Sequence, residues 1–154
     1  MWWCMLALAG APEVAFGDDG MLHGSIVIDA PVEKVAAVLD EAERIAKWSP
    51  DVLSMVPEGE ASGGCQDFAV KTKGLFRPIG YVVRRCRVEL TYTDRLVRSD
   101  DFTQVTADWV LVDQGESTLI RYVGIVALKM PVPAVMLRNA QSSSMLNTLT
   151  QIRD

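Results

Sequence analysis

Hydrophobic positions along the chain change their period after about residue 50. Before that point, the β-branched run at 25–30 predicts a short strand, and Pro31 suits the first turn of a helix because its missing N–H would be unpaired there. Apolar residues then recur at helical spacing: Val32, Val35, Ala36 and Leu39. A second short helix is expected through Ile45, ending before Pro50.

Beyond residue 50 the pattern is that of strands, separated by turns that carry Gly, Asp or Pro. The strand-like runs are 51–58, 65–73, 81–93, 95–102, 105–113 and 117–130. Because these strands follow one another with no intervening helix, they predict an antiparallel meander.

The last segment returns to helical spacing. Pro131 and Pro133 introduce a long helix over 134–154. Its expected apolar stripe consists of Met136, Ala140, Met145, Leu149 and Ile152. The whole order predicts an α+β fold in which a curved antiparallel sheet wraps around the long C-terminal helix, with two short helices after the first strand and an internal cavity.

Composition agrees with one globular domain and excludes some partners. The chain has 154 residues, of which 49% are hydrophobic and 23% charged, which suits a soluble domain with a sizeable core. Its formal net charge of -5 argues against nucleic acid, because binding phosphates requires clustered Lys and Arg.

The cysteines and the histidine offer little chemistry. Cys4, Cys65 and Cys86 are odd in number and show no C-x-x-C spacing, so we expect ordinary thiols and neither a disulfide framework nor a zinc site. His23 is the only histidine in the sequence, which leaves little material for a metal centre or a catalytic triad. No cofactor is therefore expected.

The N-terminal extension, residues 1–21, has two interpretations. Its first ten or so residues are apolar and are followed by small residues at 9–11, as in a secretory signal, but the first basic residue is Lys34. The segment is too short to span a bilayer as a helix. A clipped export signal and a partial strand or helix both stay open; a cytoplasmic location is favoured, and export is the alternative.

Residues 22–154 resemble a known superfamily. The run IDAPVEKVAAVLDEAERIAKWSPDV is similar to the first strand and helix pair of the START-like superfamily, which includes the Bet v 1 and polyketide cyclase families. More narrowly, four segments are similar to lipid-transfer START domains: KWSPDV, YVVRRCRVEL, RLVRSDDFTQVTADWVLVD and LIRYVGIVALKMPVPAVMLRNAQSSSMLNTL. Their order and spacing agree throughout.

The resemblance implies a helix-grip fold whose tunnel holds one hydrophobic ligand, such as a sterol or another lipid. It also implies a monomer, transient contact with a membrane and usually no catalysis. This chain departs from the family in its short N-terminus. It also has Thr72 where some sterol-binding members place a carboxylate facing an internal arginine, so a buried arginine–carboxylate pair is not expected.

The run YVVRRCRVEL poses a question of orientation. Successive side chains of a strand alternate between its two faces, so Arg84 and Arg85 must point in opposite directions. Hydrophobicity alone would turn Arg84 inward with Val82 and Val88, whereas the resemblance matches Arg85 to the arginine that meets the ligand's polar head. We favour Arg85; the alternative is that every arginine of the run reaches solvent.

Other candidate ligand-binding residues lie on the later strands and the last helix. They are Phe68, Thr72, Trp109, Tyr122, Met136, Asn139 and Ala140. Large amphipathic rings suit a cavity wall, and small or flexible side chains at the start of the last helix would leave room for a ligand. The alternatives are ordinary core aromatics, an ordinary strand threonine and a solvated helix face.

These features predict a non-enzymatic carrier or sensor of a hydrophobic small molecule, in particular a lipid. The alternative is an enzyme of the polyketide cyclase type, which would need at least two titratable side chains converging in the cavity. Candidate acids such as Asp100, Asp101 and Asp108 are assigned to turns and the surface instead. A filled interior would indicate a domain without a ligand.

Overall fold

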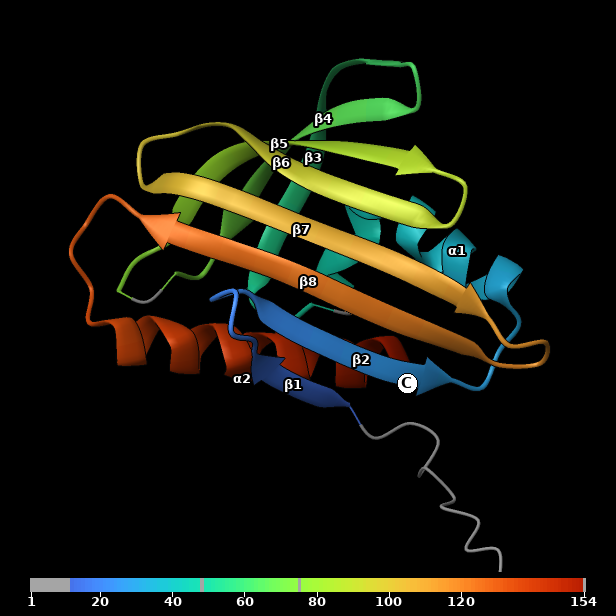
Figure 1. The fold of residues 1–154 in the computed structure, drawn as a ribbon. Helices are drawn as coiled ribbons and strands as arrows, with labels where there is room; N and C mark the ends of the chain where they lie inside the picture. Colours follow the sequence, from blue (N-terminus) through green and yellow to red (C-terminus); the bar gives the residue numbers. More distant parts are fainter. Residues whose placement is uncertain (1–11, 48, 75, 154) are drawn as a thin grey trace, which may run out of the picture.

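One curved antiparallel sheet and one long helix make up most of the molecule (Figure 1). The structure, a computed structural model, describes residues 12–47, 49–74 and 76–153. The strands are β1 Glu13–Phe16, β2 Leu22–Ile28, β3 Val52–Ser62, β4 Cys65–Thr72, β5 Ile79–Val88, β6 Thr91–Ser99, β7 Phe102–Asp113 and β8 Thr118–Leu128. The helices are α1 Val32–Asp40, the 3₁₀ helix η1 Ala42–Lys47 and α2 Ala134–Arg153. This arrangement confirms the predicted α+β helix-grip fold.

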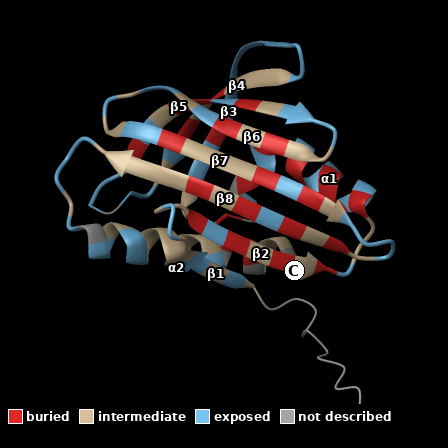
Figure 2. Ribbon diagram, in the orientation of Figure 1, coloured by how far each residue is buried: buried red, intermediate tan, exposed pale blue. Residues whose placement is uncertain are grey.

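The sheet runs in the order β1-β2-β8-β7-β6-β5-β4-β3. Strands β3 to β8 form the predicted meander. Strand β2 pairs with β8, where Ile26 opposes Ile120, and β1 forms the edge beside β2. Both of these isoleucines are almost completely buried. The residue-by-residue alternation of burial along β2 and β8 is visible in Figure 2. One face of the sheet therefore carries the core.

The short helices follow from the sequence pattern. Pro31 caps α1 in an extended conformation, and the four residues at helical spacing, Val32, Val35, Ala36 and Leu39, are all buried. In η1, Ala42 and Ile45 are buried, and this helix packs mainly on β3. Tyr92 of β6 joins α1 to the sheet by donating its hydroxyl to Asp40 Oδ1 at 2.8 Å.

The C-terminal helix α2 packs chiefly on β2 and β1 and leaves space beside the middle strands. It packs tightly against Gly24, where an added Cβ would lie 3.3 Å from Leu149 Cδ1. Leu149 is fully buried, and Met145 and Ile152 are partly buried against the core. Met136, which we had placed in the apolar stripe, is 44% exposed because the helix turns this position away from the sheet.

The run 81–93 is not one strand, as predicted, but two. The chain turns at Glu89 and Leu90, where Glu89 has a φ of 54°, and Val88 pairs with Thr91. No Gly, Asn or Asp marks this turn, so the sequence lacks the usual hairpin signal.

The prediction of ordinary thiols is also wrong for two of the three cysteines. Cys65 of β4 and Cys86 of β5 are paired in register, their Cα atoms are 4.0 Å apart, and their sulfur atoms form a disulfide. Directly opposed residues on antiparallel strands lie close enough for such a bond. Sequence spacing could not reveal the pair, because only the register of β4 against β5 brings the two residues together. Cys4 lies outside the described residues.

Candidate ligand-binding cavity

Two adjoining chambers lie between α2 and the core face of the sheet. The outer chamber, of about 280 Å³, is bounded by residues that include Thr72, Ile79, Phe102, Leu128, Leu137 and Ala140. The inner chamber, of about 170 Å³, is bounded by residues that include Met55, Val83, Arg85, Asp94, Thr106 and Trp109. Tyr81, Tyr122, Ser144 and Met145 line both chambers, so the two lie directly beside each other.

The inner chamber contains a buried ion pair. Arg85 on β5 donates from Nε and Nη2 to the two carboxylate oxygens of Asp94 on β6, each at 2.8 Å. The side chains are only 9% and 11% exposed. Burial pulls the pKa of the Arg85 guanidinium down, but the carboxylate of Asp94 outweighs this effect and the pKa stays above its ordinary value. The pair is thus ionised and carries no net charge.

Two buried polar side-chain atoms have no hydrogen-bond partner among the described residues. They are Nη1 of Arg85 and Oγ1 of Thr106, and both are buried. An unsatisfied buried donor or acceptor costs about 1–3 kcal/mol, so native structures seldom leave one without water or a ligand. Arg85 lines the inner chamber, so its Nη1 is where a ligand's polar group could be recognised. The Thr106 side chain lies on the other face of β7, since Val105 and Ala107 on either side of it belong to the core face.

Two tyrosines stand between the chambers. Burial raises the pKa of both Tyr81 and Tyr122 far above the ordinary value, and the nearby carboxylate of Asp94 raises each pKa further. Both phenols therefore remain protonated at neutral pH and can donate hydrogen bonds. The ring of Tyr122 lies 4.7 Å from that of Trp109, and the ring of Tyr81 meets Phe102 edge-on at 5.0 Å. These contacts hold the aromatic walls in place.

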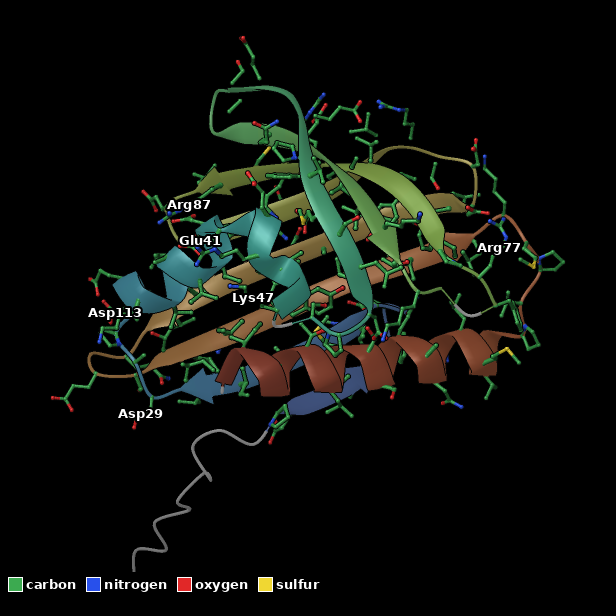
Figure 3. All side chains as sticks on the ribbon, turned by 180° about the vertical axis from the view of Figure 1, so that it is seen from behind. Asp29, Glu41, Lys47, Arg77, Arg87 and Asp113 are labelled. Atoms are coloured by element: carbon green, nitrogen blue, oxygen red, sulfur yellow. A yellow bond between two sulfur atoms is a disulfide. The ribbon has the colours of Figure 1, made fainter. Side chains whose placement is uncertain are left out.

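Two side-chain hydrogen bonds from described residues of α2 help to hold this helix over the cavity. Gln141 donates from Nε2 to the backbone oxygen of Val126 on β8 at 3.2 Å, beside the outer chamber. Farther along α2, the hydroxyls of Thr148 and Ser49 form a buried hydrogen bond at 3.1 Å. The outer chamber lies toward the end of the molecule where α2 begins, and Figure 3 shows Arg77 at that same end.

The chambers contain several of the residues singled out in the sequence. Arg85 and Trp109 line the inner chamber, Tyr122 lines both, and Thr72 and Ala140 line the outer one. Arg84, by contrast, points away from the chambers and is 56% exposed. The alternative in which every arginine of the run reaches solvent is therefore wrong for Arg85.

Three candidates lie elsewhere. Phe68 is buried in the core and is not among the described residues that line either chamber. Met136 and Asn139 are exposed on α2. The helix turns Leu137, Ala140 and Gln141 toward the cavity, so Met136 and Asn139 point outward. The placement of Met136 and Asn139 thus follows from the helical period of α2.

The sequence did not reveal the partner of Arg85. Thr72 stands where some sterol-binding members place the acid, so the sequence did not indicate a buried arginine–carboxylate pair; Asp94 supplies the carboxylate from the next strand. Arg85 and Asp94 are direct partners in the β5–β6 register, which is set by the turn at Glu89. Placing that turn correctly would have identified Asp94. Tyr81 could have been found by alternation, since it lies four residues before Arg85 on the same strand.

The described residues contain no group of three or more His, Cys, Asp or Glu side chains that could hold a metal ion. Within the same part of the chain, none of the helices is both long and apolar enough to cross a membrane. What the cavity offers is therefore apolar wall, one neutral ion pair and a few hydroxyl groups.

Comparison with solved structures finds the same fold. A START superfamily protein from Mycobacterium smegmatis is 17% identical, with a TM-score of 0.78 over 86% of this chain and 94% of that one. A STAR-related lipid transfer protein from Xanthomonas axonopodis is 14% identical, with a TM-score of 0.73 over 93% and 97%. An aromatase/cyclase from Streptomyces sp. R1128 is 13% identical, with a TM-score of 0.70 over 84% and 90%. At these identities the likeness shows the fold alone.

Sequence comparison gives the family. No curated protein matches the chain. A family model described as polyketide cyclase / dehydrase and lipid transport matches residues 21–154, which is most of the sequence. This match agrees with the helix-grip fold and with the START-like resemblance noted in the sequence. The chain therefore belongs to the polyketide cyclase / dehydrase and lipid transport family.

Proposed function

We propose that this protein binds one hydrophobic small molecule in the two chambers and recognises an uncharged polar group at its inner end. The observation that carries this proposal is the buried, unpaired Nη1 of Arg85, which lies in the wall of the inner chamber. A ligand oxygen that accepts from Nη1 would remove the cost of leaving this donor unsatisfied.

Binding affinity would come mainly from the apolar walls. Side chains such as Val83, Val126 and Leu128 surround the space, and moving a ligand's apolar surface out of water gains roughly 25 cal/mol per Å². Together the chambers suit an elongated molecule, whose body would lie in the outer chamber and whose polar end would lie in the inner one.

Charge balance favours an uncharged polar end. Asp94 already neutralises Arg85, and no other basic residue is among the described residues of the inner chamber. A phosphate or carboxylate placed there would add an uncompensated charge in a largely dehydrated site, at a cost of several kcal/mol. A hydroxyl, ketone or ester oxygen would instead accept from Arg85 Nη1 and from the Tyr81 or Tyr122 phenol, whose raised pKa values keep them protonated.

Matched ligand pairs test this proposal. Binding would be measured for cholesterol against cholesterol sulfate, and for a long-chain alcohol against the fatty acid of the same length. We expect the uncharged member of a bound pair to bind at least about tenfold more tightly. Preference for the anionic member would show that Arg85 is not held by Asp94 when the ligand binds, and binding of none in a wider panel of sterols, quinones and phospholipids would remove the proposal.

A cyclase-type activity is a second candidate, and one observation favours it. Four titratable side chains, those of Tyr81, Arg85, Asp94 and Tyr122, converge on the inner chamber. An enzyme of this type was expected to need at least two such side chains in the cavity, and this number is exceeded. However, the carboxylate is engaged by two guanidinium hydrogen bonds, and the raised pKa of each phenol makes it a weak acid. These features suit orientation of a carbonyl better than proton transfer.

An assay separates the two candidates. The protein would be supplied with a linear poly-β-ketone, and ring-closed products would be followed by liquid chromatography and mass spectrometry. For a binding protein we expect the same product distribution with wild type and with Tyr122→Phe. Faster ring closure by wild type that is lost in Tyr122→Phe would establish the enzyme.

We also propose transient contact with a membrane at the mouth of the outer chamber. Exposed apolar side chains from separate segments gather at this end: Phe76, Met130, Val135 and Met136 are 69%, 46%, 70% and 44% exposed. Phe76 and Met130 line one small pocket together with Leu128, which also borders the outer chamber. We expect Phe76→Ser combined with Val135→Ser to reduce sedimentation with phosphatidylcholine vesicles, while Val88→Ser, a change at another exposed valine, has no effect.

A further inference from the structure

The Cys65–Cys86 disulfide lies at the boundary between β4 and β5, which we call the seam. It joins β4 to β5 on the face opposite the chambers, since Cys86 follows Arg85 in the strand and side chains alternate between faces. Both cysteines are partly exposed, so a small dithiol can reach them. The neighbouring register pair is Gln66 with Arg85, so the covalent bond lies one residue from the polar centre of the inner chamber.

The seam attaches an edge hairpin to the rest of the sheet. Strand β3 is the last strand in the order, and it pairs only with β4. Positions 56–62 of β3 are all exposed, and Gly63 and Gly64 in the following turn have positive φ values of 61° and 78°. Few packed side chains therefore support this end of the hairpin, and such segments open more readily than the core.

The same hairpin forms a wall of the proposed site. Val52 and Met55 of β3 and Val70 of β4 line the inner chamber, while Thr72 of β4 lines the outer one. Away from the seam, the hairpin is held by η1, which packs on β3, and by the exposed ion pair between Glu58 and Arg98. Loosening β4 from β5 would therefore expose the chamber beside Arg85.

We propose that the Cys65–Cys86 disulfide is a redox-sensitive latch that keeps this wall closed. A dithiol reductant attacks one sulfur as a thiolate and forms a mixed disulfide, and its second thiol then displaces the protein sulfur. The protein gains two thiols by taking up two electrons and two protons, and the reductant leaves as a disulfide. After reduction, the backbone ladder and the Asp67–Arg84 ion pair still cross the seam, so the hairpin opens locally without unfolding the sheet.

The first test concerns the bond itself and the mobility of the seam, and it needs no ligand. In a Cys4→Ser background, alkylation and intact mass should find no free thiol before treatment with dithiothreitol and two afterwards. Hydrogen exchange of amides 65–72 should then become at least about tenfold faster on reduction, while amides of β7 and β8 keep their rates. Two free thiols in the untreated protein, or unchanged exchange at the seam, would overturn the latch.

The second test concerns release, and it rests on the proposed function. A bound fluorescent sterol, dehydroergosterol, should leave the reduced protein about three- to tenfold faster than the oxidised protein. The variant Cys65→Val/Cys86→Val keeps an apolar cross-strand pair without the covalent bond, and it should release the sterol quickly with or without dithiothreitol. If reduction speeds hydrogen exchange at the seam but leaves the release rate unchanged, the disulfide does not control release. If the sterol does not bind at all, that result counts against the proposed function, and the exchange test alone decides on the latch.

The variant also gives a check on stability. Closing a loop of this size commonly stabilises a protein enough that its removal lowers Tm by roughly 5–15 °C. The Cys65→Val/Cys86→Val protein should therefore melt at a lower temperature than the oxidised parent and show no further shift with dithiothreitol. A Tm that falls on reduction in this variant as well would place the redox response outside the seam.

Discussion

Arg84 and Arg85 are neighbours on β5 and make almost the same contacts in opposite surroundings. Arg84 donates from Nε and Nη2 to Asp67 on β4 at 2.8 and 3.2 Å, and Arg85 donates from the same atoms to Asp94 on β6 at 2.8 Å each. The first pair is 56% and 26% exposed, whereas the second is 9% and 11% exposed. Burial, rather than contact geometry, is what distinguishes them.

This difference decides what each pair can do. The outer pair contributes little to the free energy of folding, because water solvates both charges well when they are apart. Inside the sheet, separating Arg85 from Asp94 would leave a charge in a dehydrated site, while the intact pair presents a donor that no described residue occupies. The outer pair belongs to the solvated surface, and the inner pair forms the polar end of the proposed binding site.

Removing the inner acid should have the largest effect. Asp94→Ala leaves the Arg85 guanidinium buried without its partner, so we expect the free energy of unfolding to fall by about 3–5 kcal/mol. Urea denaturation measures this loss. Asp67→Ala is the matched control at the surface, and equal midpoints for the two variants would mean that burial does not distinguish the pairs.

Replacing both members of the inner pair should restore stability. Arg85→Met combined with Asp94→Leu exchanges two buried charges for apolar side chains of similar size, a change that is commonly neutral or stabilising by about 1–4 kcal/mol. The double variant should nevertheless lose its preference for an uncharged polar ligand over a hydrocarbon of the same size. A double variant as unstable as Asp94→Ala would indicate that the pair is required for packing.

Ligand affinity should separate the two arginines next. Arg85→Leu removes the unpaired donor and should weaken binding of an uncharged lipid by about 10- to 100-fold, the range for losing a hydrogen bond from a charged group. Arg84→Leu should leave affinity unchanged, because its side chain points away from the chambers. Titration calorimetry or fluorescence measures both, and equal losses would invalidate the assignment of faces.

Alkaline titration extends the contrast to the tyrosines. Burial raises the pKa of Tyr81 and Tyr122 far above 10 and that of Tyr92 to about 12, all above the unfolded value of 10.0. The folded state therefore holds more protons than the unfolded state, and stability is full below pH 10.0 and falls as pH rises toward the folded pKa values. Phenolate absorbance should appear together with unfolding; a phenolate that appears in folded protein near pH 10 would contradict the burial.

The smallest effect is expected at the outer pair. Arg84 holds the pKa of Asp67 below its usual value of 3.8 by hydrogen bonding, so the contribution of the carboxylate is present above that pH and is lost as pH falls through the lowered pKa. Asp67→Asn should shift the urea midpoint only slightly at neutral pH and not at all in strong acid. Added salt should reduce the neutral-pH difference further.

Much of the fold could be predicted because it depends on local patterns. The helical spacing from Val32 to Leu39, the series of turns after residue 50 and the proline-led last helix each specify an element, and their order specifies the architecture. The inward orientation of Arg85 could be favoured only with help from the resemblance, since hydrophobicity alone indicated Arg84.

The missed features depend on strand register, which the sequence does not show directly. Asp94 opposes Arg85 only because the chain turns at Glu89, a residue with no turn preference, and Cys65 opposes Cys86 only through the β4–β5 register. The exposure of Met136 likewise depends on how α2 is rotated about its axis against the sheet. Long-range pairing, rather than local propensity, therefore determines the polar end of the cavity and the disulfide.

The most direct measurement is the identity and amount of what co-purifies with the protein. Wild type, Arg84→Leu and Arg85→Leu would be isolated under native conditions and their bound molecules extracted and identified by mass spectrometry. We expect one uncharged, apolar molecule with a hydroxyl, ketone or ester oxygen in wild type and Arg84→Leu, and at least about tenfold less of it in Arg85→Leu. An anionic lipid, or the same amount in both arginine variants, would contradict recognition of an uncharged group by Arg85.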